Sequence, residues 1–433
     1  MFSDTTNAKV VKLSTDSIFI LDFPLEVLLK ILSFVDAKCL YEVVILTCKF
    51  FKKLINCVDI QKTIFSIKYD ENVISDALYV NSWRTLCFTY EKVNNWKKIN
   101  KDESKLKKLK LSGHYAPVDA VHIMPCGTIC VSGSRDRTAL VWNLRDFIEE
   151  GAEVPSCSIL QGHKGWVWAI DSDKNYPNQV ITCSWDKSLK VWDLNSDNKE
   201  SFATYEYHPA AVLDIKCHDN VYTTSCFDKS IRVFDPRSNS IVLHSMHHRR
   251  PVVCVDVTDK YIISGSEDQT IGIYDVRAGK LLRKLNLDTP VLCMNTGVEQ
   301  GFNYLRVGGK CGSLIVFDIT DDRFTLLDST ELWEHYKLTT LCNFSGCIIA
   351  GSQNGFVRCY KPDRSSTLIH KFQAHFGEVS ASYSLNNLLV TGGAPISSYG
   401  LVAEHRGSAF NHSHKKYSYD YDLTRKFTPH SLP

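Results

Sequence analysis

Residues 113–144 read GHYAPVDAVHIMPCGTICVSGSRDRTALVWNL, and this stretch decides the fold because its pattern recurs along the chain. Residues 162–194 repeat it as GHKGWVWAIDSDKNYPNQVITCSWDKSLKVWDL, and two further copies begin at His208 and His248. An aromatic residue ends each copy, at Trp142, Trp192, Phe234, Tyr274, Phe317 and Tyr360. The steps between these aromatic residues are 50, 42, 40, 43 and 43 residues. This period, close to the ~40–45 residues of a four-stranded blade, predicts a β-propeller.

Each of the first four copies also carries three polar residues at nearly fixed distances. An aspartate stands six positions before the aromatic residue, a serine or threonine four positions before that aspartate, and a histidine 20–23 positions before it. Such residues can bond in series, from aspartate to histidine to hydroxyl to indole N–H, so that each buried polar group has a partner. The complete sets are His114, Ser132, Asp136 and Trp142, and His163, Thr182, Asp186 and Trp192. Because the pattern repeats, we interpret it as a structural network and not as a catalytic triad.

These residues resemble the Asp-His-Ser/Thr-Trp network of the WD-repeat family, which implies a mainly β, seven-bladed propeller. The later copies depart from the pattern: Cys311 and Asn354 replace the aspartate in the fifth and sixth, and the seventh, which opens at His375, lacks it. In the family, a strand from the start of the array completes the last blade, and KLKKLKL at residues 105–111 is expected to supply it. We favour this outer strand over the alternative, a phosphate-binding lysine patch.

A second pattern lies near the N-terminus, where residues 21–35 read LDFPLEVLLKILSFV. Pro24 fits the first turn of a helix, and only three of the eleven residues that follow it are polar. Shorter helices are predicted over residues 38–47 and 48–55. Three short helices cannot cover so much apolar surface by themselves. Either the propeller covers it, which would make the helices a cap, or a separate protein does.

From Phe23 to Ile55 the sequence resembles the F-box family. The proline, the leucine-rich first helix, the Phe-Val-Asp ending and the Cys-Lys before an aromatic residue all match, although Phe51 replaces the usual tryptophan and Phe23 the usual leucine. The resemblance implies docking on the Skp-type linker subunit of a cullin–RING ubiquitin ligase. The side chains expected at that contact are Pro24, Leu28, Ile31, Leu32, Phe34 and Leu40.

Together the two patterns divide the chain into five parts. We predict a disordered N-terminus, a small all-α F-box, a helical linker, the WD40 propeller and a flexible tail, over residues 1–18, 19–60, 61–104, 105–402 and 403–433. This order resembles the F-box/WD-repeat family, whose members are substrate receptors of SCF-type ubiquitin ligases. Only about 20 residues precede the F-box, so the dimerisation region of some relatives is not expected and a monomer is predicted.

Composition narrows the remaining possibilities. Fifty basic side chains nearly balance 48 acidic ones, so no overall field draws the chain to nucleic acid or to a membrane. The first residues do not resemble a signal peptide, and the sixteen cysteines include no CxxC pair. We therefore expect a cytoplasmic and/or nuclear protein without a metal or other cofactor. His412 and His414 form an HxH pair, which carries little weight as a metal site in a polar tail.

We therefore predict a non-catalytic adaptor that binds the linker subunit through the F-box and target proteins through the propeller. By resemblance, the residue before each turn aspartate lies on the narrower, top face of the propeller. The binding residues expected there are Arg135, Trp166, Trp168, Trp185, Phe227, Glu267 and Gln353. An alternative packs Trp166 and Trp168 between blades. With Arg135 and Arg250 as the evident arginines, recognition of phosphorylated motifs is not favoured.

Two rival classes of function remain at this point. One is a WD-repeat scaffold with no connection to ubiquitin, in which the apolar helices serve a different assembly. The other is a propeller enzyme or nucleic-acid binder, which would need a central cluster of acidic, basic or histidine side chains. The near-neutral charge and the structural interpretation of the histidines do not favour the second class.

Overall fold

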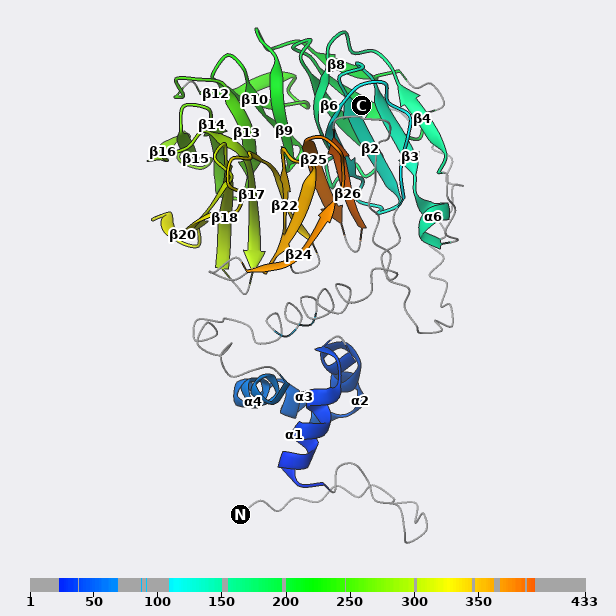
Figure 1. Ribbon diagram of the computed structural model, residues 1–433, viewed down its shortest axis with the longest axis vertical. Helices are drawn as coiled ribbons and strands as arrows, with labels where there is room; N and C mark the ends of the chain where they lie inside the picture. Colours follow the sequence, from blue (N-terminus) through cyan, green and yellow to red (C-terminus); the bar gives the residue numbers. More distant parts are fainter. Residues whose placement is uncertain are drawn as a thin grey trace, which may run out of the picture.

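The structure is a computed structural model in which a β-propeller, cyan to orange in Figure 1, accompanies a separate group of helices, drawn in blue. It describes residues 23–37, 39–68, 87, 91, 109–149, 155–196, 200–245, 247–299, 302–344, 347–361, 367–385 and 388–393. The predicted N-terminal segment, the tail with His412 and His414, and most of the predicted linker lie outside these residues. No helix in the described part of the chain has the length and apolar character needed to cross a membrane.

Short helices form where the N-terminal pattern predicts them. They are α1 (Leu25–Phe34), the π-helix η2 (Cys39–Val44), α2 (Ile45–Thr47), α3 (Lys49–Ile55) and α4 (Val58–Lys68). Pro24 precedes α1, and the Asp36 carboxylate accepts a hydrogen bond from the Cys39 amide at 2.7 Å. Helix α4 crosses the predicted boundary at residue 60, because its Ile64 and Phe65 are buried in the same core as the earlier helices. We call this unit the helical module.

The first three blades of the propeller are four-stranded antiparallel sheets. Blade 1 contains β1 (Val118–Ile123), β2 (Ile129–Ser134), β3 (Ala139–Asn143) and β4 (Cys157–Leu160), with the short helix α6 (Arg145–Glu149) between its last two strands. Blade 2 contains β5 (Val167–Asp171), β6 (Gln179–Ser184), β7 (Leu189–Asp193) and β8 (Ala203–Tyr205). Blade 3 contains β9 (Val212–His218), β10 (Val221–Cys226), β11 (Ile231–Asp235) and β12 (Ser240–Ser245).

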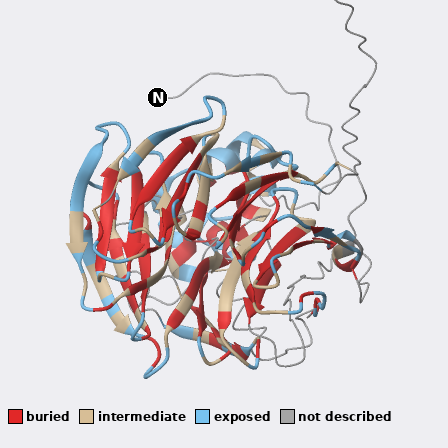
Figure 2. Cartoon of the chain, turned by 90° about the horizontal axis from the view of Figure 1, so that it is seen from above, coloured by how far each residue is buried: buried red, intermediate tan, exposed pale blue. Residues whose placement is uncertain are grey.

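Three more blades repeat this order. Blade 4 contains β13 (Val252–Val257), β14 (Tyr261–Ser266), β15 (Thr270–Asp275) and β16 (Lys280–Asn286). Blade 5 contains β17 (Val291–Glu299), β18 (Phe302–Gly309), β19 (Ser313–Asp318) and β20 (Thr325–Glu331). Blade 6 contains β21 (Leu338–Phe344), β22 (Cys347–Ser352), β23 (Phe356–Tyr360) and β24 (Leu368–Gln373). Figure 2 shows their buried residues concentrated in the strands, while exposed residues lie mainly in turns and at outer edges.

The prediction of seven regular blades is wrong, because the described residues form six four-stranded blades. Between blades 6 and 1 lies a two-stranded sheet, β25 (Val379–Leu385) and β26 (Leu388–Gly393). Residues 394–402, which would follow β26 in this copy, lie outside the described part of the chain. Leu109 and Leu111 of the predicted closing segment are buried in one cluster with Leu388 and Val390.

Hydrogen-bonded side chains tie the turn between the second and third strands to the blade. In blade 2, His163 Nδ1 lies 2.8 Å from Asp186, His163 Nε2 lies 2.7 Å from the Thr182 hydroxyl, and the Trp192 indole N–H donates to the same hydroxyl at 2.9 Å. Blade 1 has the same contacts among His114, Ser132, Asp136 and Trp142. Burial raises the pKa of each aspartate, but the hydrogen bonds from the histidine and from Thr138 or Ser188 together outweigh burial and hold the pKa well below its usual range.

Blades 3 and 4 lack the indole, and other side chains take its place. In blade 3, Arg232 pairs with Asp228 at 2.6 Å and also contacts His208. In blade 4, His247 Nε2 lies 3.2 Å from the Ser264 hydroxyl, beside the ring of His248. Gly272 makes room for it, since a Cβ at that position would meet His247 at 1.9 Å. Four turns are therefore fixed, although two of them use different chemistry.

The first prediction tests this network in blade 2. The substitution Thr182→Val keeps the side-chain shape but leaves the Trp192 indole and His163 without the hydroxyl. It should lower the free energy of unfolding by about 1–3 kcal/mol, which urea denaturation would measure. The control Thr204→Val removes an exposed hydroxyl from β8 and should change stability by no more than about 0.5 kcal/mol. Equal effects of the two substitutions would contradict the role of the network.

The second prediction concerns the pH dependence of stability. Burial lowers the pKa of four propeller histidines from 6.5 to about 4: His122, His208, His247 and His375. Between these values the unfolded chain binds protons that the folded chain does not, so stability is complete above pH 6.5 and falls as the pH falls towards 4. The melting temperature should therefore decline over this interval, before the turn aspartates titrate. A constant melting temperature from pH 7 to pH 4.5 would contradict it.

Candidate protein-binding site at the mouth of the central channel

Each first strand begins with a β-bulge that turns one side chain into the centre of the propeller. The register of each first strand with its neighbour shifts at this point, for example between Val118 and Ala120 and between Val167 and Ala169. The bulged residues are Asp119, Trp168, Leu213, Val253, Leu292, Thr339 and Ser380. All seven line one cavity of about 370 Å³, which we call the channel mouth.

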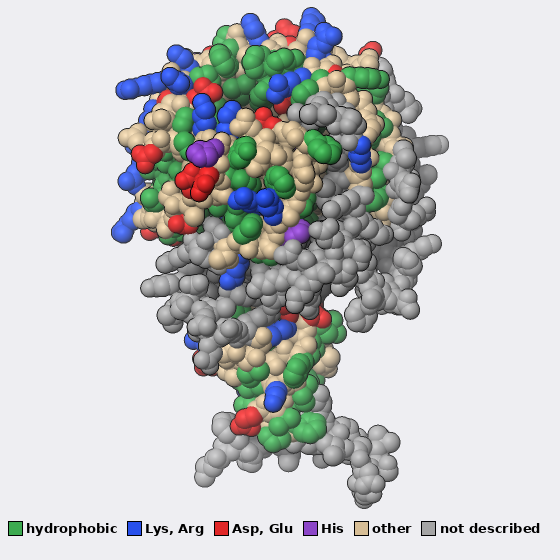
Figure 3. Space-filling model, in the orientation of Figure 1, with side chains coloured by type: hydrophobic (Ala, Val, Ile, Leu, Met, Phe, Trp, Pro, Cys, Tyr) green, Lys and Arg blue, Asp and Glu red, His purple; other side chains and the backbone are tan. Residues whose placement is uncertain are grey.

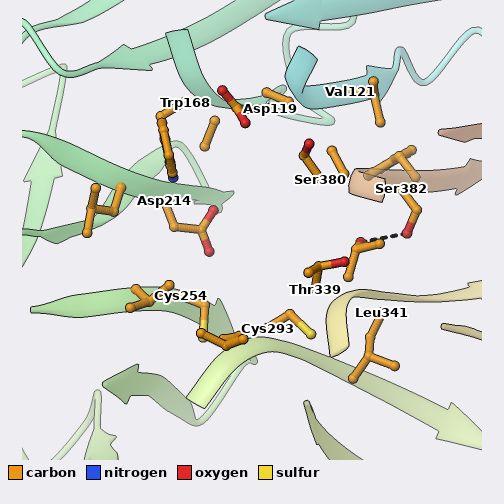
Figure 4. A pocket seen from close by; sticks show the side chains of 18 of the residues that line it. Asp119, Val121, Trp168, Asp214, Cys254, Cys293, Thr339, Leu341, Ser380 and Ser382 are labelled. Atoms are coloured by element: carbon orange, nitrogen blue, oxygen red, sulfur yellow. Dashed lines mark hydrogen bonds between the residues drawn. The ribbon is translucent and has the colours of Figure 1, made fainter. Parts of the chain in front are cut away.

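Figure 4 shows side chains from different strands around this space, with Trp168 and Asp119 on one side and Cys254, Cys293 and Thr339 on others. Of the predicted binding residues, the channel mouth contains Arg135 and Trp168. The other bulged residues were missed by sequence reasoning. A signal was available, because Asp119, Trp168, Leu213 and Val253 each stand five positions after the histidine of their copy.

Four predicted residues meet in a patch on blades 2 and 3, which we call the aromatic patch: Trp166, Trp168, Trp185 and Phe227. The ring centroids of Trp166 and Trp185 are 5.0 Å apart, those of Trp168 and Trp185 5.6 Å, and those of Trp185 and Phe227 6.3 Å. Trp166, Trp185 and Phe227 are 38%, 40% and 51% exposed. The rings therefore pack on one another, yet present apolar surface to solvent, which is typical of a protein-binding site.

Arg135 joins the aromatic patch to the channel mouth. Its guanidinium lies 5.1 Å from the Trp166 ring centroid and 5.4 Å from that of Trp168. It also donates two hydrogen bonds to the Asp119 carboxylate, at 2.7 and 3.1 Å. Burial raises the pKa of Asp119, while the bonds from Arg135 oppose the rise. Arg135 therefore stabilises a carboxylate and holds two tryptophan rings in place.

Glu267 and Gln353 are exposed at equivalent positions on blades 4 and 6, but they are not among the residues of the aromatic patch or of the channel mouth. The equivalence follows from the backbone, because in six blades the amide at this position donates to the carbonyl just before a first strand. These residues are Arg135, Trp185, Phe227, Glu267, Lys310 and Gln353. Sequence reasoning missed Lys310, because blade 5 lacks the turn aspartate that marked the position. One ring of turns therefore carries all six side chains.

Charged groups also line the channel mouth, around Lys216. Burial opposes its charge, but the carboxylates of Asp171, Asp214 and Asp256 outweigh burial and raise the pKa of the amine. Burial also raises the pKa of Asp214 to about 6. Asp171, Asp214 and Asp256 each accept a backbone N–H from the first strand of the following blade, at 2.7–2.9 Å. The three aspartates therefore join neighbouring blades, and this structural role explains why they lie there.

Within the described residues, no three histidine, cysteine, aspartate or glutamate side chains gather as metal ligands would.

The residues predicted for linker-subunit binding divide into two sets. Leu28, Leu32 and Leu40 are buried within the helical module, so their side chains are not at its surface. Pro24 and Phe34 are exposed and Ile31 is partly exposed. The physical reason is that α1 is apolar on nearly every side, so its sequence does not separate the face that packs inward from the face left outside.

Other apolar side chains, which the prediction missed, join the exposed set. The helical module also exposes Phe23, Leu25, Val27, Val43, Leu46, Phe50, Val58 and Ile67. Phe34 and Leu46 are the most exposed, at 83% and 77%. Figure 3 shows hydrophobic side chains gathered on this lower part of the molecule. So much apolar surface on a small unit indicates a protein-binding site.

Comparisons with known proteins agree with this architecture. The family "WD domain, G-beta repeat" matches residues 105–143, 155–193 and 240–275. F-box/WD repeat-containing protein 9 of Homo sapiens is 28% identical over 388 residues, which cover 87% of this chain and 81% of that protein. F-box/WD repeat-containing protein mec-15 of Caenorhabditis elegans is 26% identical over 188 residues, or 42% of this chain and 44% of that protein.

A solved structure shows the same fold at low sequence identity. The WD40 beta propeller domain of Doa1 aligns with a TM-score of 0.57 and 16% identity, over 67% of this chain and 93% of that one. Repeats, fixed turns and blades together define this chain as a WD-repeat β-propeller protein with N-terminal helices. The similarity over 87% of its length supports its place in the F-box/WD-repeat family, as the sequence patterns predicted.

The third prediction tests the anchoring of the site. Arg135→Ala would leave the Asp119 carboxylate, whose side chain is only 5% exposed, without its cation. The free energy of unfolding should fall by about 1–3 kcal/mol, as measured by urea denaturation. The control Arg137→Ala alters an exposed residue of the same turn and should change stability by no more than about 0.5 kcal/mol. Adding Asp119→Asn to Arg135→Ala should recover part of the loss, and its failure to do so would contradict the pairing.

Proposed function

We propose that this chain is a substrate-recognition adaptor of a Skp–cullin–F-box ubiquitin ligase. In this proposal the helical module is an F-box that binds the Skp-type linker subunit. The propeller binds target proteins at its channel mouth and aromatic patch. The observation that carries the proposal is the presence of two separate exposed apolar surfaces, one on each module.

The helical module supports the first half of the proposal. Phe34 lies at the end of α1 and Leu46 within α2, and both expose most of their side chains. Burying a phenylalanine or leucine side chain contributes about 1.5–3 kcal/mol, so a few such contacts suffice for stable association. The names of the relatives in the comparison contain the term F-box, which agrees with a docking role.

The aromatic patch supports the second half. Large aromatic side chains that are partly exposed and held in place contribute strongly to protein interfaces, because they lose little conformational freedom on binding. Trp166 and Trp185 meet this description, since their rings contact each other and Arg135 stacks on Trp166. A linear segment of a partner could lay an apolar side chain against these rings.

The proposed mechanism needs no chemistry from this chain. If one module binds the ligase scaffold and the other binds a target, the target lysine stays near the ubiquitin carrier at a raised effective concentration. The alternative, a WD-repeat scaffold without a link to ubiquitin, would use the same aromatic patch but not the linker subunit.

The fourth prediction tests docking in cells. The intact chain should recover the linker and cullin subunits in a pull-down. The double substitution Phe34→Ser and Leu46→Ser should reduce that recovery at least about tenfold, because both side chains are exposed and their loss leaves the core intact. Leu28 is unsuitable for this test, since it is buried and its replacement would destabilise the module.

A matched control is available on α4, where Val58 and Ile67 are also apolar and exposed. The double substitution Val58→Ser and Ile67→Ser should leave recovery within about twofold of the intact chain. If a folded intact chain recovers neither subunit, the ligase adaptor is excluded and the scaffold alternative stands. If both pairs of substitutions act alike, Phe34 and Leu46 are not the contact.

A further inference from the structure

We propose that the aromatic patch recognises an acidic, unphosphorylated linear segment that carries a large apolar side chain. The inference rests on the propeller half of the proposed function and adds the chemical class of the target. The apolar side chain packs against Trp166, Trp185 and Phe227. Aspartate and glutamate side chains on either side of it contact a surrounding set of basic residues.

The basic residues lie in the turns that carry the aromatic patch. Arg137, Lys187 and Lys229 follow the turn aspartates of blades 1 to 3, each with a positive φ of 72–74° that repeats the same turn geometry. Lys187 and Lys229 are therefore two residues from Trp185 and Phe227. All three basic side chains are exposed.

Further basic residues come from the loops that enter the first strands. Lys164 and Arg249 directly follow the network histidines, and their amides bond to the turn aspartates at 2.8 and 2.7 Å, which places both loops against the turns. Arg250 is exposed beside Arg249. We call this set the basic rim: Arg137, Lys164, Lys187, Lys229, Arg249 and Arg250. Figure 3 shows lysine and arginine side chains over the upper part of the propeller.

The basic rim is not balanced by acidic residues on its own face. In the described turns and entry loops of blades 1 to 4, the exposed acidic residues are Glu206 and Glu267, against the six basic ones. The turn aspartates do not compensate, because their side chains are only 5–15% exposed and bond within the blades. The local field therefore favours a negatively charged partner.

The opposite face of the same blades differs. There Asp219 and Asp259 are highly exposed, and Arg237 pairs with Asp235 at 2.8 Å. Lys260 is exposed in the same turn as Asp259. Arg145, Lys174 and Arg277 are also exposed on that face, so the basic rim is distinguished by the aromatic patch that it surrounds and not by positive charge alone.

Carboxylates fit the basic rim better than phosphate groups do. Phosphate recognition typically uses arginine forks that converge on one point. Arg135, which lines the channel mouth, already donates two guanidinium hydrogen bonds to the Asp119 carboxylate. The rim side chains are spread over four blades, with three lysines among them, which suits several separate carboxylates. The channel mouth has both signs of charge, with Asp119, Asp214 and Glu378 beside Arg135, Lys216 and Lys337, so the excess of positive charge lies on the rim.

The fifth prediction tests this class with the full chain and fluorescent peptides. The probe is a peptide that alternates glutamate with leucine and phenylalanine, and fluorescence anisotropy measures its binding. It should bind at least about tenfold more tightly than the same peptide with lysine in place of glutamate, and raised salt should weaken it. Replacing the glutamates by serines should abolish binding, and phosphorylating those serines should restore no more than the glutamates provide.

Two variants and a control locate the contact. Lys187→Glu with Lys229→Glu should weaken binding about tenfold, and Trp185→Ala with Phe227→Ala should weaken it at least as much. Lys260→Glu reverses an exposed charge on the opposite face and should leave binding within about twofold. Thermal melting checks that each variant is folded. If the glutamate pair is not folded, Lys187→Gln with Lys229→Gln removes the same two charges without reversing them.

Each outcome decides the inference. The inference is overturned if the acidic and basic peptides bind equally well. It is also overturned if Lys260→Glu weakens binding as much as Lys187→Glu with Lys229→Glu. Binding of the phosphoserine peptide alone overturns it in favour of a phosphate reader. Capture of the linker subunit by the same variants is measured in parallel, because it depends on the helical module. If the intact chain captures the linker subunit but does not bind the acidic peptide, the inference is contradicted and the proposed function still stands.

Discussion

The bond between a turn aspartate and a buried histidine is the constraint on which the site depends. His163 holds Asp186 at 2.8 Å, and Asp186 in turn accepts the amides of Lys164 and Ser188. One carboxylate thus fixes both the loop that enters β5 and the turn between β6 and β7. Trp185 is the residue just before that aspartate and Trp166 lies just after the histidine loop, so the bond sets the spacing of both rings.

Blades 3 and 4 show that the position of the turn matters more than the chemistry that fixes it. His247 takes the place of the indole N–H at the Ser264 hydroxyl, whereas the Arg232 guanidinium bonds to Asp228, Ser230 and His208 instead. Blade 3 still presents Phe227 and blade 4 still presents Glu267 at the equivalent backbone position. Since the turns keep their geometry, the side chain before the aspartate is free to vary, and in blades 2 and 3 it is aromatic.

Sequence spacing predicted much of this structure, and particular residues show which features it could not predict. The networks of blades 1 and 2 followed from the repeat, because they depend on contacts within one copy. Arg232 and His247 could not be foreseen, since their roles depend on which side chain reaches a vacant space in the folded blade. The bulged residues other than Trp168 were missed because a bulge shifts the strand register by one residue. Leu28 and Leu32 were placed in an interface because α1, which is apolar on nearly every side, does not reveal its inner face.

We propose that two surfaces act independently: apolar side chains of the helical module bind the ligase scaffold, and the aromatic patch binds the target. Hydrogen–deuterium exchange of the full chain, alone and with purified linker subunit, tests this claim most directly. When the linker subunit is bound, we expect slower exchange in residues 24–46 and unchanged exchange in the turns at residues 184–188 and 226–230. Protection of those propeller turns by the linker subunit, or no protection in the helices when both proteins are folded and mixed, would contradict it.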